Sequence, residues 1–532
     1  MTWRSITEKA RALAGLIALT GCQSIPEASL EQADVLIMRG QIFDGTGNPA
    51  QSADIAIRDD KIIFVGSEGH RRFQVDTVID AIGLVVAPGF IDPHTHAGSD
   101  LASEDDSRRA NLAFAFQGVT TVVVGNDGHG STRVREMAEK ANNQGIGTNV
   151  AYLAGFGYLR KQVIGNIDRA PTKVELERMK TAMTGAMCEG AYGLSAGLYY
   201  TPQNFAKTDE VITLAKVAAR FGGYYDTHMR DESTYNIGVA GALREAIEIS
   251  RQSGAPLHVS HIKALGPAVW GHSARMITLI EDARAEGMKI TADQYPWTAS
   301  GTRISNALMP RWSLSGGLEG LRTRLKSAET RKKIQSEIVQ NLERRGGASR
   351  LLITAGLGEA EVTVGKNLAE IADAQGIDPV LAAVRIVEKG DARVASFNMN
   401  PDDIKAFAQR NWVVTGSDGS TGHPRKYASF PKAYQDFVVR DQLLSLAQFI
   451  RRSSGQTADI TGLKDRGYLK AGMVADIVLF DPKKFSPRAT YQLPTELTAG
   501  VVHLFVNGVR LIENGEYRGA LPGQPLLKDN QC

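Results

Sequence analysis

The sequence has little cysteine and almost no excess charge of either sign. Its 532 residues include three cysteines, Cys22, Cys188 and Cys532, which are too few and too scattered for a disulfide framework or a cysteine-rich zinc site. We expect Cys188 to be a small buried residue, and we assign Cys532 no role. With 61 basic and 58 acidic side chains the net charge is +3, which indicates neither a nucleic-acid nor an acidic partner.

The N-terminus lacks a long hydrophobic run. Its apolar segment, 12–20, is far shorter than the ~20 residues that span a bilayer. Basic residues precede this segment and small residues follow it, a pattern that predicts a signal peptide over 1–22. The closing letters LTGC resemble the lipobox of bacterial lipoproteins. This resemblance implies that Cys22 is lipidated and that 23–32 is a tether, and Gln23 after the cysteine implies the outer membrane.

The alternative for this segment is an ordinary N-terminal helix with a chance cysteine. In the lipoprotein interpretation the acyl chains on Cys22 anchor the protein, and each buried CH₂ contributes about 0.8 kcal/mol. We therefore expect an exported protein that is lipid-anchored at the outer membrane and faces the periplasm. No other membrane contact is expected, and the sequence does not indicate an oligomeric state.

Short strand-like segments occur near both ends of the chain. Short apolar runs that end at turn signals fill 33–86, and the same sequence pattern recurs in 465–528. Two all-β pieces that flank a long middle predict a small β-sandwich domain formed from both terminal segments. The composition, 43% hydrophobic with 54 glycines, is that of a globular enzyme with an ample core.

The middle of the chain, 87–464, alternates short apolar runs with helix-like segments. Eight strands alternating with helices predict an α/β fold of the (β/α)8, TIM-like barrel type. The interval 297–411 is too long for a single crossover, so we expect an insertion there that forms a lid at the barrel mouth. The eight runs end near residues 96, 127, 157, 198, 230, 263, 296 and 420.

Polar residues cluster at the ends of these runs, where the active sites of such barrels lie. The stretch GFIDPHTH places His94 and His96 one residue apart, so that on an extended backbone they project to the same side. Histidines and carboxylates that converge on one barrel mouth predict a site for Zn²⁺, with one or two divalent ions. The predicted ligands are His94, His96, Asp127, His228, His261 and Asp418.

The chain resembles the metal-dependent amidohydrolase superfamily, whose hallmarks are PGFIDPHTH on the first strand and the aspartate of GSDG on the eighth. Further stretches resemble the branch of D-aminoacylases, or N-acyl-D-amino-acid deacylases. Among them are GLSAGLYYTP, THMRDES, VSHIKALG, DQYPWTASGTR and GSDGSTGHPRKYASFP. The resemblance extends from about residue 33 to 528.

The resemblance implies a role for each predicted ligand. One metal would be held by Asp127 together with His228 and His261. A second, often weaker, position would be formed by His94, His96 and Asp418, and Asp418 would be the proton carrier.

Other positions match residues that contact substrate in that branch. Lys263 and Tyr199 are the clearest matches, and His423 is assigned either to substrate or to its own loop. Further candidates for the substrate carboxylate are Arg230, Tyr295 and Arg303.

Three positions depart from the pattern of that branch. Asp127 stands where the family usually has a cysteine ligand, and a carboxylate is a harder ligand that tolerates other divalent ions. Phe156 replaces the histidine of a GHG motif, and His129 stands where the family tends to have an apolar residue. These departures bear on which substrate is accepted more than on which reaction is catalysed.

The resulting hypothesis is hydrolysis of the amide of N-acyl-D-amino acids, or of closely related N-acyl amino acids or dipeptides. A metal-activated hydroxide would be the nucleophile, and Asp418 would shuttle the proton. One alternative is a cyclic-amide hydrolase or an isoaspartyl-type dipeptidase, but the fourth run, GLSAGL, has no lysine that could be carboxylated to bridge two metals. A remote alternative is a non-catalytic, ligand-binding lipoprotein.

Overall fold

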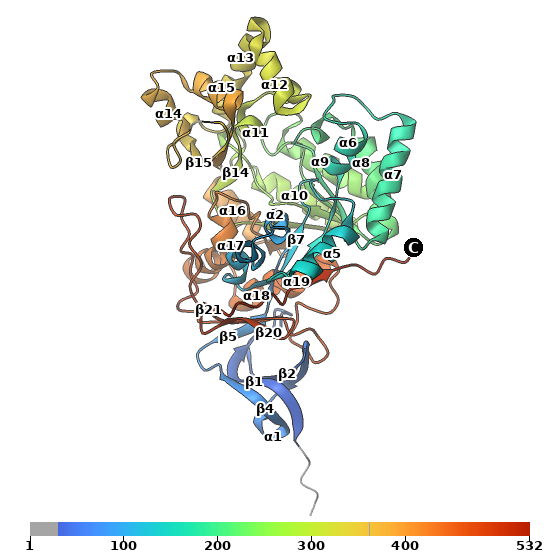
Figure 1. Ribbon diagram of the computed structural model, residues 1–532, viewed down its shortest axis with the longest axis vertical. Helices are drawn as coiled ribbons and strands as arrows, with labels where there is room; N and C mark the ends of the chain where they lie inside the picture. The colour runs from blue at the N-terminus through green and yellow to red at the C-terminus, as the bar shows by residue number, and fades with distance from the viewer. Residues whose placement is uncertain (1–29, 361) are drawn as a thin grey trace, which may run out of the picture.

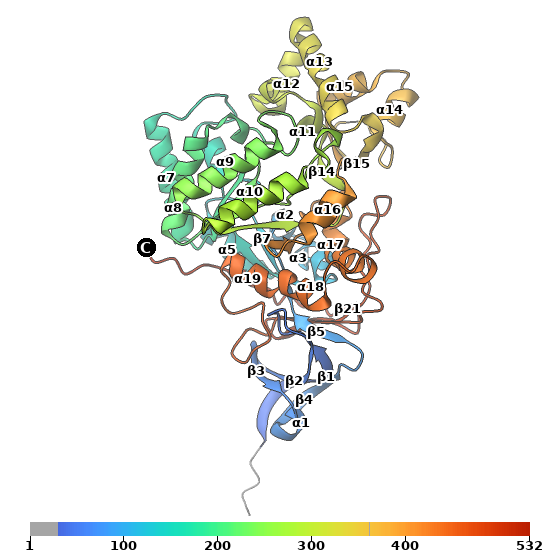
Figure 2. The ribbon, with the colours of Figure 1, turned by 180° about the vertical axis from the view of Figure 1, so that it is seen from behind.

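The computed structural model describes residues 30–360 and 362–532. The predicted signal peptide, the lipidation site Cys22 and most of the predicted tether lie outside these residues. Figures 1 and 2 show three tiers along the long axis: a sheet at one end, a central body of strands and helices, and a helical tier at the other end. Within the described residues, no helix is long and apolar enough to cross a membrane.

The first tier is a single nine-stranded sheet built from both ends of the chain. Strand β5 (Val85–Pro88) pairs with β18 (Ile477–Phe480), which joins the N-terminal strands to the C-terminal ones. All nine strands belong to one hydrogen-bonded sheet, in which β4 pairs with β1 beside the main path. Its other strands are β1 (Glu31–Ile42), β2 (Gln51–Arg58), β3 (Lys61–Gly66), β4 (Phe73–Asp80), β19 (Val501–Val506), β20 (Val509–Glu513) and β21 (Glu516–Tyr517).

Strand β1 already begins at Glu31, so the last two residues of the predicted tether are part of the sheet. Its alternate residues Val35 and Ile37 pack with Ile55 of β2 and Ile477 of β18 in one apolar cluster. Leu36 between them is buried as well and packs with Ala56 and Phe73 in a second cluster, so the middle of β1 is covered on both faces.

The central tier consists of parallel strands with helices between them. The strands form two hydrogen-bonded runs, β6-β7-β8 and β9-β10-β11-β12-β13-β17. Leu153 alone separates β8 from β9, and a parallel bridge between Thr95 and Gly419 brings the ends of the first and last strands together. The strands are β6 (Phe90–Asp92), β7 (Val119–Val124), β8 (Asn149–Tyr152), β9 (Ala154–Gly155), β10 (Gly193–Gly197), β11 (Tyr224–His228), β12 (Leu257–Val259), β13 (Ile290–Gln294) and β17 (Val413–Thr415).

The helices of this tier bury one face against the strands. In α8 (Thr208–Arg220), Val211, Leu214, Ala215 and Ala218 recur at helical spacing and are buried. Helix α7 (Lys173–Cys188) begins with a reciprocal capping box at Thr172 and Glu175, which satisfies two free N–H groups. The other main helices are α5 (Val134–Gln144), α9 (Gly238–Ser253), α10 (Ser273–Ala285) and α16 (Pro401–Ala408).

The third tier lies within the predicted insertion 297–411. Strands β14 (Ala299–Arg303), β16 (Gly390–Phe397) and β15 (Leu351–Gly358) form an antiparallel sheet in that order. Helices α12 (Gly317–Lys326), α13 (Ala328–Arg344), α14 (Leu368–Ala374) and α15 (Pro379–Lys389) cover it. This tier has its own apolar core, separate from that of the central tier.

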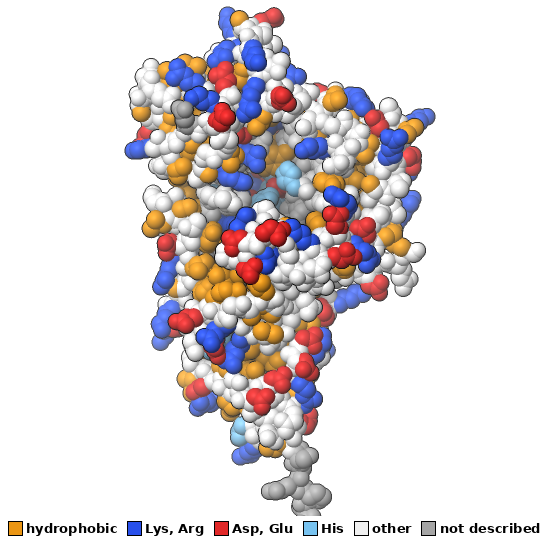
Figure 3. Space-filling view, viewed as in Figure 1, with side chains coloured by type: hydrophobic (Ala, Val, Ile, Leu, Met, Phe, Trp, Pro, Cys, Tyr) orange, Lys and Arg blue, Asp and Glu red, His pale blue; other side chains and the backbone are white. Residues whose placement is uncertain are grey.

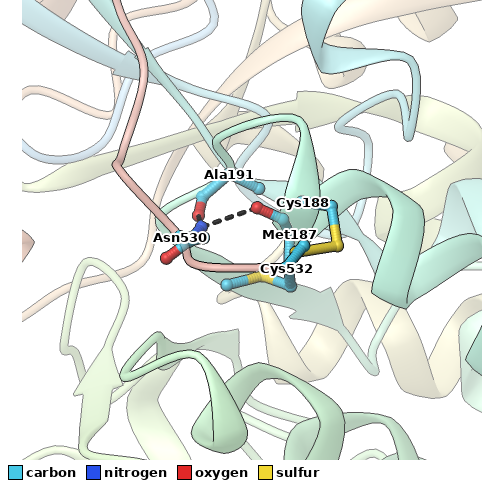
Figure 4. The surroundings of a disulfide bond; sticks show 5 residues. All are labelled: Met187, Cys188, Ala191, Asn530 and Cys532. Carbon is cyan, nitrogen blue, oxygen red and sulfur yellow. Dashed lines mark hydrogen bonds between the residues drawn. A yellow bond between two sulfur atoms is a disulfide. The ribbon is translucent and has the colours of Figure 1, made fainter.

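The structure contains a disulfide that the sequence analysis did not anticipate. Cys188, the last residue of α7 (Lys173–Cys188), is bonded to Cys532 across 344 residues of chain (Figure 4). The expectation that Cys188 is simply a small buried residue and that Cys532 has no role was therefore wrong. Spacing along the chain could not reveal the pair, because only the fold brings these two residues together.

The C-terminal tail that carries Cys532 is bound to the central tier along its length. Its strand β22 (Pro525–Leu526) pairs with β8. Lys528 Nζ donates to the carbonyl of Phe221 at 2.9 Å. Asn530 Nδ2 donates to the carbonyls of Met187 at 2.6 Å and Ala191 at 3.1 Å (Figure 4). These contacts tie the tail to backbone carbonyls at or just beyond the C-terminal ends of α7 and α8.

Candidate functional site

Six predicted residues converge at the carboxyl ends of the parallel strands. His94 and His96 follow β6, Asp127 follows β7, and His228 is the last residue of β11. His261 follows β12, and Asp418 follows β17. Parallel strands end at the same edge of a sheet, so the topology brings together side chains that are up to 324 residues apart (94 to 418). All of them are buried except His96, which is partly exposed.

The Asp127 carboxylate lies at the centre of this group. Its Oδ1 is 3.5 Å from His94 Nε2, 3.5 Å from His261 Nε2 and 3.8 Å from His228 Nδ1. Its Oδ2 is 3.6 Å from His96 Nε2. Asp127 therefore lies between two sets of potential ligands.

The second set centres on Asp418. Its Oδ1 lies 3.1 Å from His96 Nε2 and 3.8 Å from His94 Nε2. Its Oδ2 lies 2.7 Å from Arg425 Nη1 in an ion pair, and both partners are buried. The described residues thus contain the trios His94–His96–Asp418 and His94–Asp127–His261 as groups that could hold a metal ion.

The unsatisfied polar atoms of the site fit a divalent metal. Both ring nitrogens of His94 and Oδ1 of Asp127 are buried without a hydrogen-bond partner, an arrangement that is costly in an apolar interior. Ligand atoms about 2.0–2.1 Å from a tetrahedral Zn²⁺ are about 3.3–3.5 Å apart. Most separations around Asp127 Oδ1 are close to that value, so the donor set matches a nitrogen–oxygen zinc site.

The protonation states of two of the proposed ligands, His94 and His228, also suit metal binding. Burial lowers the pKa of His94 and of His228 to about 4, although neighbouring carboxylates oppose the shift. Both rings are therefore neutral near pH 7, as a ligand must be. Burial alone would raise the pKa of Asp418, but the Arg425 guanidinium and the neighbouring histidines hold it well below its usual value.

Three of these residues have a left-handed backbone. The φ angles are 57° at Asp127, 37° at His261 and 47° at Asp418, a region that costs a side-chain-bearing residue of order 1–3 kcal/mol. Neighbouring contacts hold this geometry. His261 N donates to Asp293 Oδ1 at 3.0 Å, and Gly128 N donates to Ser195 Oγ at 3.1 Å. At each of these residues the left-handed backbone ends the extended conformation of the strand, and the side chain points into the site.

Lys263 and the tyrosines form one wall of the site. Lys263 Nζ lies 2.7 Å from Glu232 Oε1 and 2.6 Å from His261 Nδ1. Tyr199 donates its hydroxyl to the carbonyl of Asn306 at 2.8 Å, which links the wall to the insertion. The Tyr295 hydroxyl is buried with no hydrogen-bond partner and lines the same cavity.

A cavity of about 440 Å³ opens over these residues. Figure 3 shows histidine side chains at the bottom of a hollow beneath the third tier, with Lys and Arg side chains around it. Arg303 and His129 line the cavity as well. Its size suits a small molecule, and its lining is rich in groups that bind anions.

Two predicted substrate residues lie elsewhere. Arg230 forms a two-bond ion pair with Glu245, at 2.8 and 2.9 Å, and also donates to backbone carbonyls. His423 bonds the carbonyl of Ala299 at 3.1 Å, accepts from Arg425 N at 3.1 Å and does not line the cavity. Arg230 is thus committed to structural contacts, and His423 fixes its own loop.

Several residues of the site were not predicted from the sequence. Glu232, Tyr200, Arg345, Arg393 and Arg425 all line the cavity. Glu232 and Arg425 lie inside motifs that resemble the deacylase branch, so their positions were available as a signal. Arg393 lies in the insertion, where no motif marks it, and only the pairing of β16 with β14 reveals its place.

Comparisons with known proteins agree with this geometry. An amidohydrolase family model matches residues 332–512. An N-acyl-D-aspartate deacylase and a D-aminoacylase of Alcaligenes xylosoxydans xylosoxydans are each 30% identical over 524 residues, 93% of this chain, and the match covers 95% and 98% of their own lengths. An N-acyl-D-glutamate deacylase of the same organism is 31% identical over 526 residues, which cover 94% of this chain and 97% of its own length.

Solved structures show the same relationship. A D-aminoacylase with a binuclear metal centre superposes with a TM-score of 0.80 at 28% identity, covering 93% of this chain and 100% of that one. An N-acyl-D-glutamate deacylase from Bordetella bronchiseptica, complexed with zinc and a phosphonate mimic of the tetrahedral intermediate, has a TM-score of 0.79 at 30% identity, with the same coverage. The chain belongs to the amidohydrolase superfamily, in its D-aminoacylase branch.

Proposed function

We propose that this protein is a zinc-dependent hydrolase that cleaves the amide bond of N-acyl-D-amino acids. The observation that carries the proposal is the position of Asp127, whose carboxylate lies within 3.8 Å of four histidines in a buried site. A divalent ion held there supplies a water of lowered pKa and polarises a carbonyl oxygen. His228, His261 and Asp127 would hold one ion, and His94, His96 and Asp418 would hold a second.

Asp418 is the proton carrier in this proposal. Its Oδ1 faces the histidine pair of the first strand, while Arg425 holds Oδ2. A carboxylate fixed in this way can take a proton from the attacking water and pass it to the leaving nitrogen. Glu232, the other carboxylate beside the histidines, is not assigned this role, because its Oε1 is paired with Lys263.

Lys263, Tyr199 and Tyr295 bind the substrate in this proposal. All three line the cavity beside the proposed ligands, and the ammonium of Lys263 would form a charge-assisted bond with the α-carboxylate. Burial places the phenols in low-dielectric surroundings and raises the pKa of Tyr295 well above its usual value. Tyr295 therefore remains a neutral hydrogen-bond donor.

We also propose that the parallel strands close into a (β/α)8 barrel. The bridge between Thr95 and Gly419 supports closure, because it joins the first and eighth segments in the parallel sense. The fourth segment, β10, ends at Gly197 without a lysine. This supports a linear-amide substrate over the cyclic amides and isoaspartyl dipeptides of enzymes that need a carboxylated lysine at this position.

The proposed location is the periplasmic side of the outer membrane, with an anchor at Cys22. The Cys188–Cys532 disulfide supports export, because such bonds form and persist in oxidising compartments and are rare in the cytosol of mesophiles. Export would be tested by fractionating cells that express the full chain, and anchoring by comparing it with Cys22→Ala. Recovery of the wild-type protein in the cytosol with free thiols would contradict export.

The activity is tested with matched N-acetyl-D- and N-acetyl-L-amino acids, by measuring free amino acid released by the zinc-loaded enzyme. We expect turnover of the D series and none by Asp418→Asn, whose fold is checked by its melting temperature. Turnover of the L series alone, or turnover by Asp418→Asn at the wild-type rate, would contradict the proposal.

A further inference from the structure

The carboxylate of Glu232 lies against both histidines of the first proposed metal position. Its Oε2 is 3.6 Å from His228 Nε2, and its Oε1 is 3.2 Å from His261 Nδ1. Glu232 is buried and follows His228 by four residues, on the loop after β11. One carboxylate thus offers one oxygen to each ring.

The two histidines direct their other ring nitrogens toward each other and toward Asp127. His228 Nδ1 is 2.9 Å from His261 Nε2, and these two atoms lie 3.8 and 3.5 Å from Asp127 Oδ1. An ion held together with Asp127 would therefore use Nδ1 of His228 and Nε2 of His261. A neutral imidazole has one lone pair and one N–H, so the N–H groups would lie at His228 Nε2 and His261 Nδ1, the atoms that face Glu232.

His261 Nδ1 has two polar side chains beside it. Lys263 Nζ lies 2.6 Å away and Glu232 Oε1 lies 3.2 Å away. An ammonium has three donors and no acceptor, so of these two neighbours the carboxylate is the one that can accept from an Nδ1–H group. Lys263 also donates to Glu232 Oε1 at 2.7 Å, which balances the negative charge of Glu232 in its buried surroundings.

The backbone around Glu232 is held by hydrogen bonds from both sides. Asp231 accepts from Ser233 N at 2.8 Å and from Gly238 N at 3.0 Å, which closes the loop after β11. Leu265 N donates to the Glu232 carbonyl at 2.8 Å and joins this loop to the segment after β12. The carboxylate therefore has a fixed base from which to orient other groups.

We propose that Glu232 is a positioning residue for the first metal, which accepts from His228 Nε2–H and from His261 Nδ1–H and so fixes the tautomer and orientation of both rings. Partners of this kind commonly hold metal-bound histidines in place. The inference rests on the metal position of the proposed function and adds to it a residue that does not bind the ion.

The alternative role for Glu232 is that of a direct ligand. His228, Glu232 and His261 form a further group of buried side chains that could hold a metal ion. An ion bound to His261 Nδ1 would lie beside the Lys263 ammonium, which is 2.6 Å from that nitrogen. Two positive charges at this separation repel each other strongly in a buried site, so the contacts favour the positioning role.

The test measures zinc affinity by competition with a chelator. All proteins carry His96→Ala, which removes one ligand of the second position, so the titration reports the first. Glu232→Gln should weaken zinc binding by about 10- to 100-fold, because a carboxamide has one acceptor oxygen for two N–H groups. Glu232→Asp keeps both acceptor oxygens and should retain more zinc affinity than Glu232→Gln.

Glu210→Gln is the matched control for the loss of a buried carboxylate. Glu210 is 6% exposed, compared with 5% for Glu232, and is paired with the buried Arg160 at 2.7 Å. It does not line the cavity. Both substitutions should lower the melting temperature, whereas only Glu232→Gln should change zinc affinity. Equal zinc affinities of Glu232→Gln and Glu210→Gln would overturn the proposal.

The second readout is the tautomer of each histidine. Nitrogen NMR spectra of the zinc-loaded protein, labelled with ¹⁵N-histidine, should show the proton at Nε2 of His228 and at Nδ1 of His261. Protons at the opposite nitrogens would overturn the proposal. Glu232→Gln that binds no zinc at the first position even at millimolar zinc would place Glu232 among the ligands and overturn it as well.

These readouts do not depend on turnover, so they separate the inference from the function on which it rests. Weakened zinc binding in Glu232→Gln, together with wild-type protein that hydrolyses no N-acetyl-D-amino acid, would support the positioning role and contradict the deacylase function. Unchanged zinc binding in Glu232→Gln, together with normal turnover of N-acetyl-D-amino acids by the wild-type protein, would overturn the positioning role and leave the deacylase function standing.

Discussion

Asp127 Oδ1 is equidistant, at 3.5 Å, from His94 Nε2 and His261 Nε2. One carboxylate oxygen thus faces a histidine from each of the two sets of ligands, and the other oxygen faces His96. A bidentate carboxylate can bridge two ions, whereas the usual cysteine of this branch offers a single soft sulfur. The identity of residue 127 should therefore govern which metals are bound and how tightly.

We predict that Asp127→Cys raises the preference for Zn²⁺ over Mn²⁺, because thiolate is a softer ligand than carboxylate. Asp127→Ala should remove at least one equivalent of bound metal. Metal content after dialysis, measured by atomic emission for each loaded variant, checks both statements. If the ratio of retained Zn²⁺ to retained Mn²⁺ were the same in the wild-type protein and in Asp127→Cys, residue 127 would not govern the choice of metal.

The disulfide should contribute to stability without affecting chemistry. Removal of a native disulfide typically costs about 2–5 kcal/mol, and Cys188 lies on α7, outside the cavity. We expect the double variant Cys188→Ser/Cys532→Ser to melt at a lower temperature and to retain wild-type kcat at 25 °C. Thiol titration of the denatured, unreduced protein is the companion measurement, and accessible thiols at both positions would contradict the bond.

A buried ion pair connects the first tier to the central one. Arg466 Nη1 lies 2.6 Å from Asp476 Oδ2, which also accepts from Asn149 at the start of β8. The same arginine pairs with Asp465 at 3.1 Å, and the Asp465 side chain is 53% exposed. The two aspartates thus form a matched pair of sites, one buried and one at the surface.

We predict that Asp476→Asn lowers the free energy of unfolding by up to about 3–5 kcal/mol, because it removes the buried partner of Arg466 and leaves only the exposed Asp465 to balance its charge. Asp465→Asn should change it by less than about 1 kcal/mol, since exposed pairs contribute little. Denaturant unfolding of both variants provides the comparison. Equal effects of the two substitutions would show that burial does not govern this pair.

His503 on β19 makes the first tier sensitive to acid. Burial, followed by the charge of Arg510, lowers the pKa of His503 below its usual 6.5. Below pH 6.5 the unfolded chain therefore binds a proton that the folded chain does not, so stability falls as the pH drops from 6.5 through the folded-state pKa. The contribution of this histidine is at most about 1.4 kcal/mol per pH unit.

Melting temperatures measured from pH 8 to pH 5 should show this loss, and His503→Gln should have a shallower slope over the same range. His70→Gln is the control, because His70 is exposed, and its slope should match that of the wild-type protein. A steeper slope for His503→Gln would contradict the claim that His503 lowers the stability of the folded protein as the pH falls.

Much of the site could be anticipated from local sequence. A histidine pair directly after a strand-like run, and single histidines or aspartates after later runs, identify the ends of parallel strands. The structure places all six predicted ligands in one group, in which only His96 is partly exposed. The structural role of Arg230 could not be predicted in this way. Its ion-pair partner Glu245 lies on the next helix, α9, and no local sequence pattern indicates the pair.

By itself, the sequence determined the order of strands and helices, the positions of the chemically active side chains and the resemblance to one family. These properties follow from residue type and short spacing. The tertiary structure alone decided which cations of the cavity are paired, that Arg303 faces Arg393, and that Cys188 meets Cys532. The last two contacts join residues 90 and 344 positions apart. Strand register sets the first and the packing of the C-terminal tail sets the second.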